Sequence, residues 1–136
     1  MNSLERVSKT LRFEEPDRVP VYPLLSGVTR KLVNATYEQW ANDADTCAAA
    51  YIKAAELYRL DAICTLTDLS VEAADFGAKI VYPENEAAHP ALNHRLIQTA
   101  EDYKTIAPIR PQEGKRMSEH IRLCEKLVEA KGQEMP

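Results

Sequence analysis

The carboxylate best placed for chemistry in this sequence is Asp68, which follows Thr67 at the end of the apolar run Asp61–Leu66. A short apolar run of this kind is typical of a buried β-strand. In α/β proteins the carboxyl end of such a strand gives way to an exposed loop, and residues at this point face the substrate. We therefore predict that Asp68 is catalytic and that Thr67 helps to form the substrate-binding pocket.

Asp68 also has a structural interpretation, because aspartate is a preferred helix N-cap and a short amphipathic segment, Leu69–Phe76, follows it. The two roles are compatible. Glu72 lies four residues beyond Asp68, which places both carboxylates on one face if the segment is helical. Such a pair suits acid–base work or substrate binding, whereas the alternative for Glu72 is a solvated surface carboxylate.

Tyr22 and Ser26 are the other candidate substrate-binding residues, because they lie at or just beyond the end of another apolar run, Val19–Leu25. This run does not alternate, which is typical of a strand covered on both faces. Pro20 and Pro23 lack amide donors, so we expect the strand to be short or incompletely paired. For Tyr22 the alternative role is packing in the core.

The sequence predicts no metal site and no nucleotide cradle in this chain. The three histidines do not form a ligand set, and the three cysteines are far apart, without a C-x-x-C pair. We expect these thiols to be reduced, as in a cytoplasmic protein. The sequence contains no glycine-rich loop of the G-x-G-x-x-G or P-loop kind.

The composition indicates one globular domain at most, with 136 residues of which 45% are hydrophobic. The net charge is −4 and no basic stripe is present, which argues against a nucleic-acid partner. No apolar stretch reaches the roughly 20 residues of a membrane span, and Met1–Lys9 lacks the apolar core of a signal peptide. We therefore expect a cytoplasmic protein without a membrane partner.

The first half of the chain predicts a βαβ unit. A helix capped by Ser3 precedes the strand Val19–Leu25, and Thr36–Gln39 fits a capping box. The amphipathic helix Ala44–Tyr58, capped at Asn42–Asp43, then leads to the strand Asp61–Leu66. Two buried strands joined by a long helical crossover are expected to be parallel.

The second half predicts a strand at Ala78–Tyr82, a hairpin partner at His94–Thr99, a short helical turn at Glu101–Lys104 and a long helix at Glu113–Ala130. Two parallel strands and a hairpin cannot cover three helices with strong apolar faces. We therefore expect the sheet to be incomplete, and either self-association or a missing part of the chain to cover it.

Several strings, taken together, resemble the uroporphyrinogen decarboxylase superfamily, which includes decarboxylases and corrinoid-dependent methyltransferases. These strings are Glu5–Val7, Glu14–Val21, Thr67–Leu69 and Val71–Ala78. The resemblance implies an α/β fold: the N-terminal portion of a (β/α)8 TIM barrel, incomplete in this chain. Residues 1–136 would form a single partial domain with an N-terminal helix, two barrel strands, a hairpin insertion and a long helix before strand three.

Within the superfamily, the resemblance favours the methyltransferase branch. The decarboxylases carry arginines just after the first strand, but Leu25 and Thr29 stand at those positions here, and Arg30 is displaced by one. The family implies a corrinoid on a partner protein and, in several members, a zinc held by residues beyond this chain. In the decarboxylases the aspartate that matches Asp68 receives pyrrole N–H groups; in a methyltransferase it could orient a substrate or accept a proton.

The expected function is therefore part of a methyltransferase that moves a methyl group between a corrinoid protein and a small substrate. One alternative is a uroporphyrinogen decarboxylase. The other is a non-catalytic fragment or subunit that oligomerises. We expect residues 1–136 alone to be inactive, because an active site built from eight loops cannot work with two.

Overall fold

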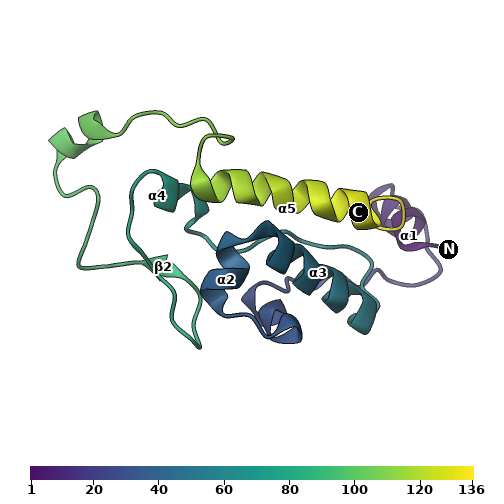
Figure 1. Cartoon of the computed structure of the whole chain (residues 1–136). Coiled ribbons are helices and arrows are strands. Elements are labelled where there is room, and N and C mark those ends of the chain that lie inside the picture. The colour runs from purple at the N-terminus through teal and green to yellow at the C-terminus, as the bar shows by residue number, and fades with distance from the viewer.

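The computed structural model describes all residues, 1–136, as an elongated and mainly helical chain. Helix α1 and both chain termini lie at one end of the molecule, and the small hairpin lies towards the other (Figure 1). None of the helices is long and apolar enough to cross a lipid bilayer. The elements in order are α1 (Ser3–Leu11), η1 (Gly27–Val33), α2 (Tyr37–Asn42), α3 (Ala44–Tyr58), α4 (Val71–Asp75), β1 (Ile80–Val81), β2 (His89–Pro90), η2 (Ala100–Thr105) and α5 (Lys115–Lys131).

The helix signals in the sequence predict most of these elements. Helix α3 has the predicted bounds, since the Asp43 side chain accepts the Thr46 amide at 2.7 Å and Arg59 ends the helix in the left-handed region. The capping box at Thr36 and Gln39 is confirmed at α2. The turn η2 is confirmed, and the last helix begins two residues and ends one residue later than predicted.

The cap of α1 differs from the prediction. Asn2, not Ser3, is the N-cap: its side chain accepts the Glu5 amide at 2.8 Å, and Glu5 returns the bond to complete a capping box. The Ser3 hydroxyl instead donates to Asp61 at 2.8 Å. The local cap is therefore made one residue earlier, and Ser3 is used for a contact distant in sequence.

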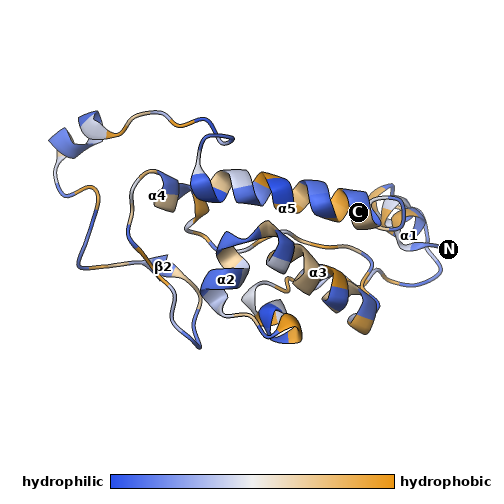
Figure 2. Cartoon of the chain, viewed as in Figure 1, coloured by the Kyte–Doolittle hydropathy of each residue, from blue (hydrophilic) through white to orange (hydrophobic).

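The core lies between α2, α3 and α5. Small side chains on α3 let its neighbours approach closely, and Trp40 of α2 is fully buried beside them. Leu123 and Leu127 enter from α5, which alternates between hydrophilic and hydrophobic residues along its length (Figure 2). Only 26 of the 136 residues are buried, so many large apolar side chains remain in contact with water.

The two predicted barrel strands do not form β-ladders. Val19–Leu25 and Asp61–Leu66 are extended, but one backbone hydrogen bond, from the Asp61 amide to the Val21 carbonyl at 2.8 Å, joins them. The prediction of strands was wrong here for a physical reason. Pro20 and Pro23 cannot donate, and an isolated pair of strands has too few partners to be stable.

These two extended segments nevertheless run in the same direction. At one end the Asp61 amide bonds to Val21. Gly27 follows Val21 by the same number of residues as Thr67 follows Asp61. These two later residues are also linked, because Gly27 lies against the ring of Tyr37 and the Tyr37 hydroxyl donates to the Thr67 carbonyl at 3.1 Å. The parallel order expected from the sequence is therefore present, although the ladder and the remainder of a barrel are not.

The hairpin has a different second strand from the one predicted. Strands β1 and β2 are antiparallel, with Ile80 opposite Pro90 and Val81 opposite His89. The chain returns after a loop shorter than the predicted one, and this earlier return buries Ala88 in the core. The predicted partner His94–Thr99 lies beyond the hairpin and is irregular, with bends in place of a strand.

The end of the molecule near the chain termini is held together by the buried carboxylate of Asp61. It is fully buried and accepts hydrogen bonds from four groups: the Ser3 hydroxyl, the Arg6 and Arg18 guanidinium groups and the Val21 amide. Burial acts to raise the pKa of Asp61, but these hydrogen bonds outweigh it and lower the pKa to about 2. The carboxylate thus joins α1 to both extended segments.

We predict that Asp61→Asn lowers the free energy of unfolding by about 3–5 kcal/mol at pH 7, because it leaves buried donors without their charged partner. Urea titration measures this loss. Because folding lowers the pKa of Asp61, its contribution is present above about pH 4 and is lost as the pH falls through about 2, so the two proteins should converge there. Glu14→Gln, in an exposed pair with Arg12, is the control and should change little. An unchanged midpoint for Asp61→Asn would contradict this role.

Candidate functional site

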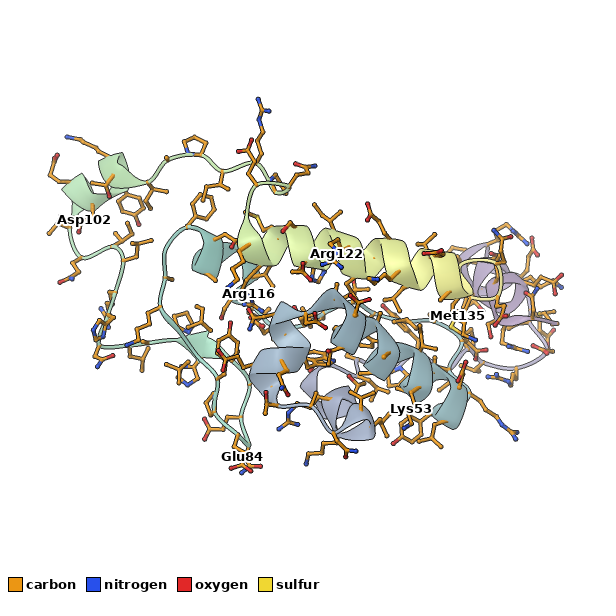
Figure 3. All side chains as sticks on the ribbon, viewed as in Figure 1. Lys53, Glu84, Asp102, Arg116, Arg122 and Met135 are labelled. Atoms are coloured by element: carbon orange, nitrogen blue, oxygen red, sulfur yellow. The ribbon has the colours of Figure 1, made fainter.

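Asp68 lies at the end of the second extended segment and forms a buried ion pair. Its side chain is 1% exposed, and that of Arg116, from the first turn of α5, is 4% exposed. The guanidinium donates in bidentate fashion, at 2.5 Å to Oδ2 and 3.1 Å to Oδ1. Figure 3 shows Arg116 between α5 and α2, at the end of α5 away from the chain termini.

The local sequence explains how Asp68 is oriented. Its Oδ1 accepts the Ser70 amide at 2.7 Å, two residues on, which is a typical aspartate turn. Helix α4 begins after Ser70, whose own side chain makes no capping bond. Asp68 is therefore not the N-cap residue itself, but its side chain stabilises the turn that leads into the helix.

A second carboxylate, that of Asp75, fixes the start of α5. Gly114 is the N-cap of α5 and has no side chain, so Asp75 from α4 accepts the amides of Arg116 at 2.9 Å and Met117 at 2.7 Å. A Cβ on Gly114 would meet Asp75 Oδ2 at 2.4 Å, so this close approach requires glycine. The negative charge also complements the positive end of the helix dipole.

Arg116 is surrounded by further partners. It donates to the Ala41 carbonyl at 3.2 Å, and its guanidinium lies 5.9 Å from the centre of the Tyr82 ring. Burial disfavours its charge, but Asp68 outweighs this effect and the pKa of Arg116 is raised. Arg116 is thus a permanent cation held within the protein.

Thr67 is the one predicted site residue that lies directly beside Asp68 in a buried position. It is 4% exposed, and its carbonyl accepts the Tyr37 hydroxyl at 3.1 Å. Its own hydroxyl is buried and has no hydrogen-bond partner in the protein. Thr67 therefore presents a free polar group in the interior next to the ion pair.

The other three predicted residues do not gather around Asp68. Tyr22 is 52% exposed, so it is not a core residue, and contact with the Cys64 thiol raises the pKa of its hydroxyl. Ser26 is half-buried and lines a surface depression of about 270 Å³ near Asn85. Glu72 is exposed, and no hydrogen bond joins it to Asp68.

Sequence reasoning missed Arg116 and His120. Both belong to the face of α5 that packs inward, with Leu123 and Leu127 as its buried apolar members. The spacing of these four residues, at i, i+4, i+7 and i+11, is the signal that could have found them. Val128 lies off this face and is 68% exposed, although it is apolar.

The stretch after the first extended segment presents no free guanidinium group. Thr29 is 2% exposed and donates to the Ser26 carbonyl at 3.0 Å. Arg30 is also buried: it donates to the carbonyls of Gly27, at 3.3 Å, and Glu84, and its guanidinium lies 5.6 Å from the centre of the Tyr37 ring. Glu84 is seen in the hairpin loop in Figure 3. The side chains of Thr29 and Arg30 are thus both hydrogen-bonded to backbone carbonyls of the chain itself.

The residues of this chain do not fit a zinc site. No three histidine, cysteine, aspartate or glutamate side chains lie close enough together to hold a metal ion. The Cys47 thiol is buried, and this burial raises its pKa well above the usual value, which disfavours the thiolate that zinc requires. A zinc of the kind that the resemblance implies would need ligands other than these residues.

We predict that Asp68→Asn and Arg116→Met each lower the free energy of unfolding by about 3–5 kcal/mol, because each leaves a buried charge without its partner. The double variant should lose less than the sum, with a coupling energy of about 1–3 kcal/mol. Denaturant titration of all four proteins measures it. Arg122→Met, which removes an exposed arginine from the same helix, is the control and should cost under about 1 kcal/mol. Strict additivity would show that the pair does not contribute as a unit.

Comparison with known proteins identifies one family. The family model described as "Uroporphyrinogen decarboxylase (URO-D)" matches residues 2–136, nearly the whole chain. No curated protein and no solved structure matches it. The chain therefore belongs to the uroporphyrinogen decarboxylase family.

Proposed function

We propose that this chain is the N-terminal part of a methyltransferase that moves a methyl group between a corrinoid protein and a small substrate. The observation that carries the proposal is that Thr29 and Arg30 are both buried and hydrogen-bonded within the chain. Thr29 stands where a decarboxylase of the family is expected to have an arginine, and Arg30 is buried and bonded to two carbonyl groups.

A porphyrinogen substrate carries several carboxylates, and guanidinium groups are their best bidentate partners. Arg116 cannot take this role without leaving Asp68, and Arg30 cannot take it without leaving Gly27 and Glu84. Breaking a buried ion pair costs about 3–5 kcal/mol, which would be subtracted from the binding energy of the substrate. A small, weakly charged substrate avoids this cost, which favours methyl transfer.

In this proposal Asp68 orients the substrate through the acceptor capacity that it retains. A carboxylate has about four lone-pair sites. Ser70 and Arg116 use Oδ1, and Arg116 alone donates to Oδ2, so Oδ2 can accept one more hydrogen bond. With a thiol as acceptor, the S–H proton must leave as the new carbon–sulfur bond forms and the methyl–cobalt bond breaks. Asp68 would receive or direct that proton.

Thr67 lies next to this carboxylate in sequence. Tyr22, Ser26 and Glu72 would contact the substrate only from more exposed positions. The methyl group comes from, or goes to, the corrinoid carried by a partner protein, and the proposal requires no metal ligand from residues 1–136. Localisation in the cytoplasm, where such carriers and free thiols coexist, is part of the same proposal.

The experiment uses the complete polypeptide that contains residues 1–136. We expect it to demethylate methylcobalamin in the presence of a thiol, followed by the change in cobalamin absorbance, and to release no decarboxylated product from uroporphyrinogen. Asp68→Asn should lower the methyl-transfer rate by about 10²-fold or more. The exposed Glu101→Gln is the matched control, and circular dichroism checks that both variants fold.

Turnover of uroporphyrinogen would overturn the proposal in favour of the decarboxylase. Full methyl-transfer activity in a folded Asp68→Asn enzyme would overturn the role of Asp68 while leaving the reaction class intact. We expect residues 1–136 alone to show neither activity, since two extended segments do not complete an eight-stranded active site.

A second candidate function, a subunit that associates through its apolar surface, is favoured by the exposed side chains. Val19 is 82% exposed, Leu69 is 89% exposed and Leu92 is 79% exposed. Side chains of this kind usually gain stability from a partner surface.

We therefore expect residues 1–136 in isolation to form dimers or larger assemblies in light scattering. The replacement Leu69→Ser should shift the distribution towards the monomer, and Lys115→Ser, at an exposed polar position of α5, is the control. A monomer with a cooperative thermal transition would contradict this candidate.

A further inference from the structure

Four polar side-chain atoms without a hydrogen-bond partner belong to residues around one small, partly open cavity. Five such atoms exist in the chain, and these four are Trp40 Nε1, Thr67 Oγ1, Arg116 Nε and His120 Nδ1. All four residues line the same cavity between α2, α3, α5 and the turn before α4. Orphaned polar groups are rare in protein interiors, so their concentration at one place calls for a shared partner.

The cavity has the size of one water molecule. About 10 Å³ is open to a water molecule within it. A buried water needs roughly 10–15 Å³ by this measure and two to four polar partners. Both conditions are met here, since the volume is at the lower end of this range and four polar groups line the cavity. Trp40 and Arg116 are almost completely excluded from solvent, so bulk water does not supply their partner.

The donors and acceptors also balance. The indole of Trp40 and the Nε–H of Arg116 can only donate, a neutral His120 can accept at Nδ1, and the Thr67 hydroxyl can do either. One water molecule accepts two hydrogen bonds and donates two. We propose that this cavity is a binding site for a single water molecule that accepts from Trp40 and Arg116 and donates to His120 and Thr67.

The surroundings favour the neutral imidazole that this arrangement needs. Burial lowers the pKa of His120, and the nearby Arg116 cation acts in the same direction, whereas Glu72 and Asp68 oppose it. A neutral imidazole carries one proton, and the proposed site requires it on Nε2, which leaves Nδ1 as an acceptor. The carboxylates of Asp43 and Glu119 also line the cavity and disfavour an anion as the occupant.

The water would give a partner to the one nitrogen of Arg116 that has none. Its Nη atoms already bind Asp68 and Ala41, and only Nε lacks a partner. Through the water, Arg116 would be connected to Thr67 on the extended segment and to Trp40 on α2. The site is thus a positioning device for the Asp68–Arg116 pair, and it does not depend on which reaction the protein performs.

The single tryptophan makes the test direct, because its indole N–H gives one identifiable NMR signal. We expect cross-peaks between this proton and water with the sign of a long-lived bound molecule. Ala44→Val, which fills the cavity, should abolish them, and Ala49→Val, the same change at an exposed position of α3, should leave them intact. Thr67→Val should keep the cross-peaks, since three partners remain.

Three outcomes would overturn the site. Absence of the cross-peaks in the folded wild-type chain would show a dry cavity. Loss of the cross-peaks in folded Thr67→Val would show that they arose from exchange of the Thr67 hydroxyl proton rather than from bound water. A saturable shift of the indole signal with sodium chloride, but not with sodium sulfate at equal ionic strength, would identify chloride as the occupant. Because the wild-type and Thr67→Val measurements suffice, the test does not depend on whether Ala44→Val folds.

Discussion

The structure depends on the requirement that two charges taken out of water must stay together. Asp68 and Arg116 are both almost completely buried, and they meet across a long separation in sequence. Once formed, such a pair is costly to break, because either charge alone would be left in a medium that solvates it poorly. The start of α5 is therefore fixed at the exit of the second extended segment. Asp75 strengthens this arrangement by accepting the first amides of the helix.

The same principle operates at the opposite end of that segment. Asp61 is buried there and bonds to Arg6 of α1 and to Arg18. Residues 61–68 thus begin and end with a carboxylate that is held by arginines from elsewhere in the chain. This explains how the segment stays extended although a single backbone-to-backbone hydrogen bond, to Val21, joins it to its parallel neighbour. Ion pairs at the two ends take the place of the ladder that an interior strand would have.

The features that could be predicted from the sequence are those determined by nearby residues. The Asp43 cap and the apolar periodicity of α3 act within a few positions, and both predictions are confirmed. Strand formation at Val19–Leu25 failed because a ladder requires partners that a short-range pattern does not reveal. Asp68 was found because its position at a segment end is local, whereas its partner Arg116 was not, because their contact depends on how α5 packs. The second strand of the hairpin was also misplaced, because strand pairing depends on contacts that the local pattern does not reveal.

The internal hydrogen bonds of the two buried arginines, Arg30 and Arg116, also limit which substrates the protein could recognise. Arg116 is paired with Asp68, and Arg30 is bonded to backbone carbonyls, so both Nη atoms of each cation are already hydrogen-bonded within the fold. Recognition of an acidic substrate would require one of these cations to exchange an internal partner for an external one. A thiol or a methyl donor makes no such demand, because it needs an acceptor, and Oδ2 of Asp68 has capacity for one. The electrostatic arrangement that stabilises this part of the fold therefore favours small substrates over polycarboxylates.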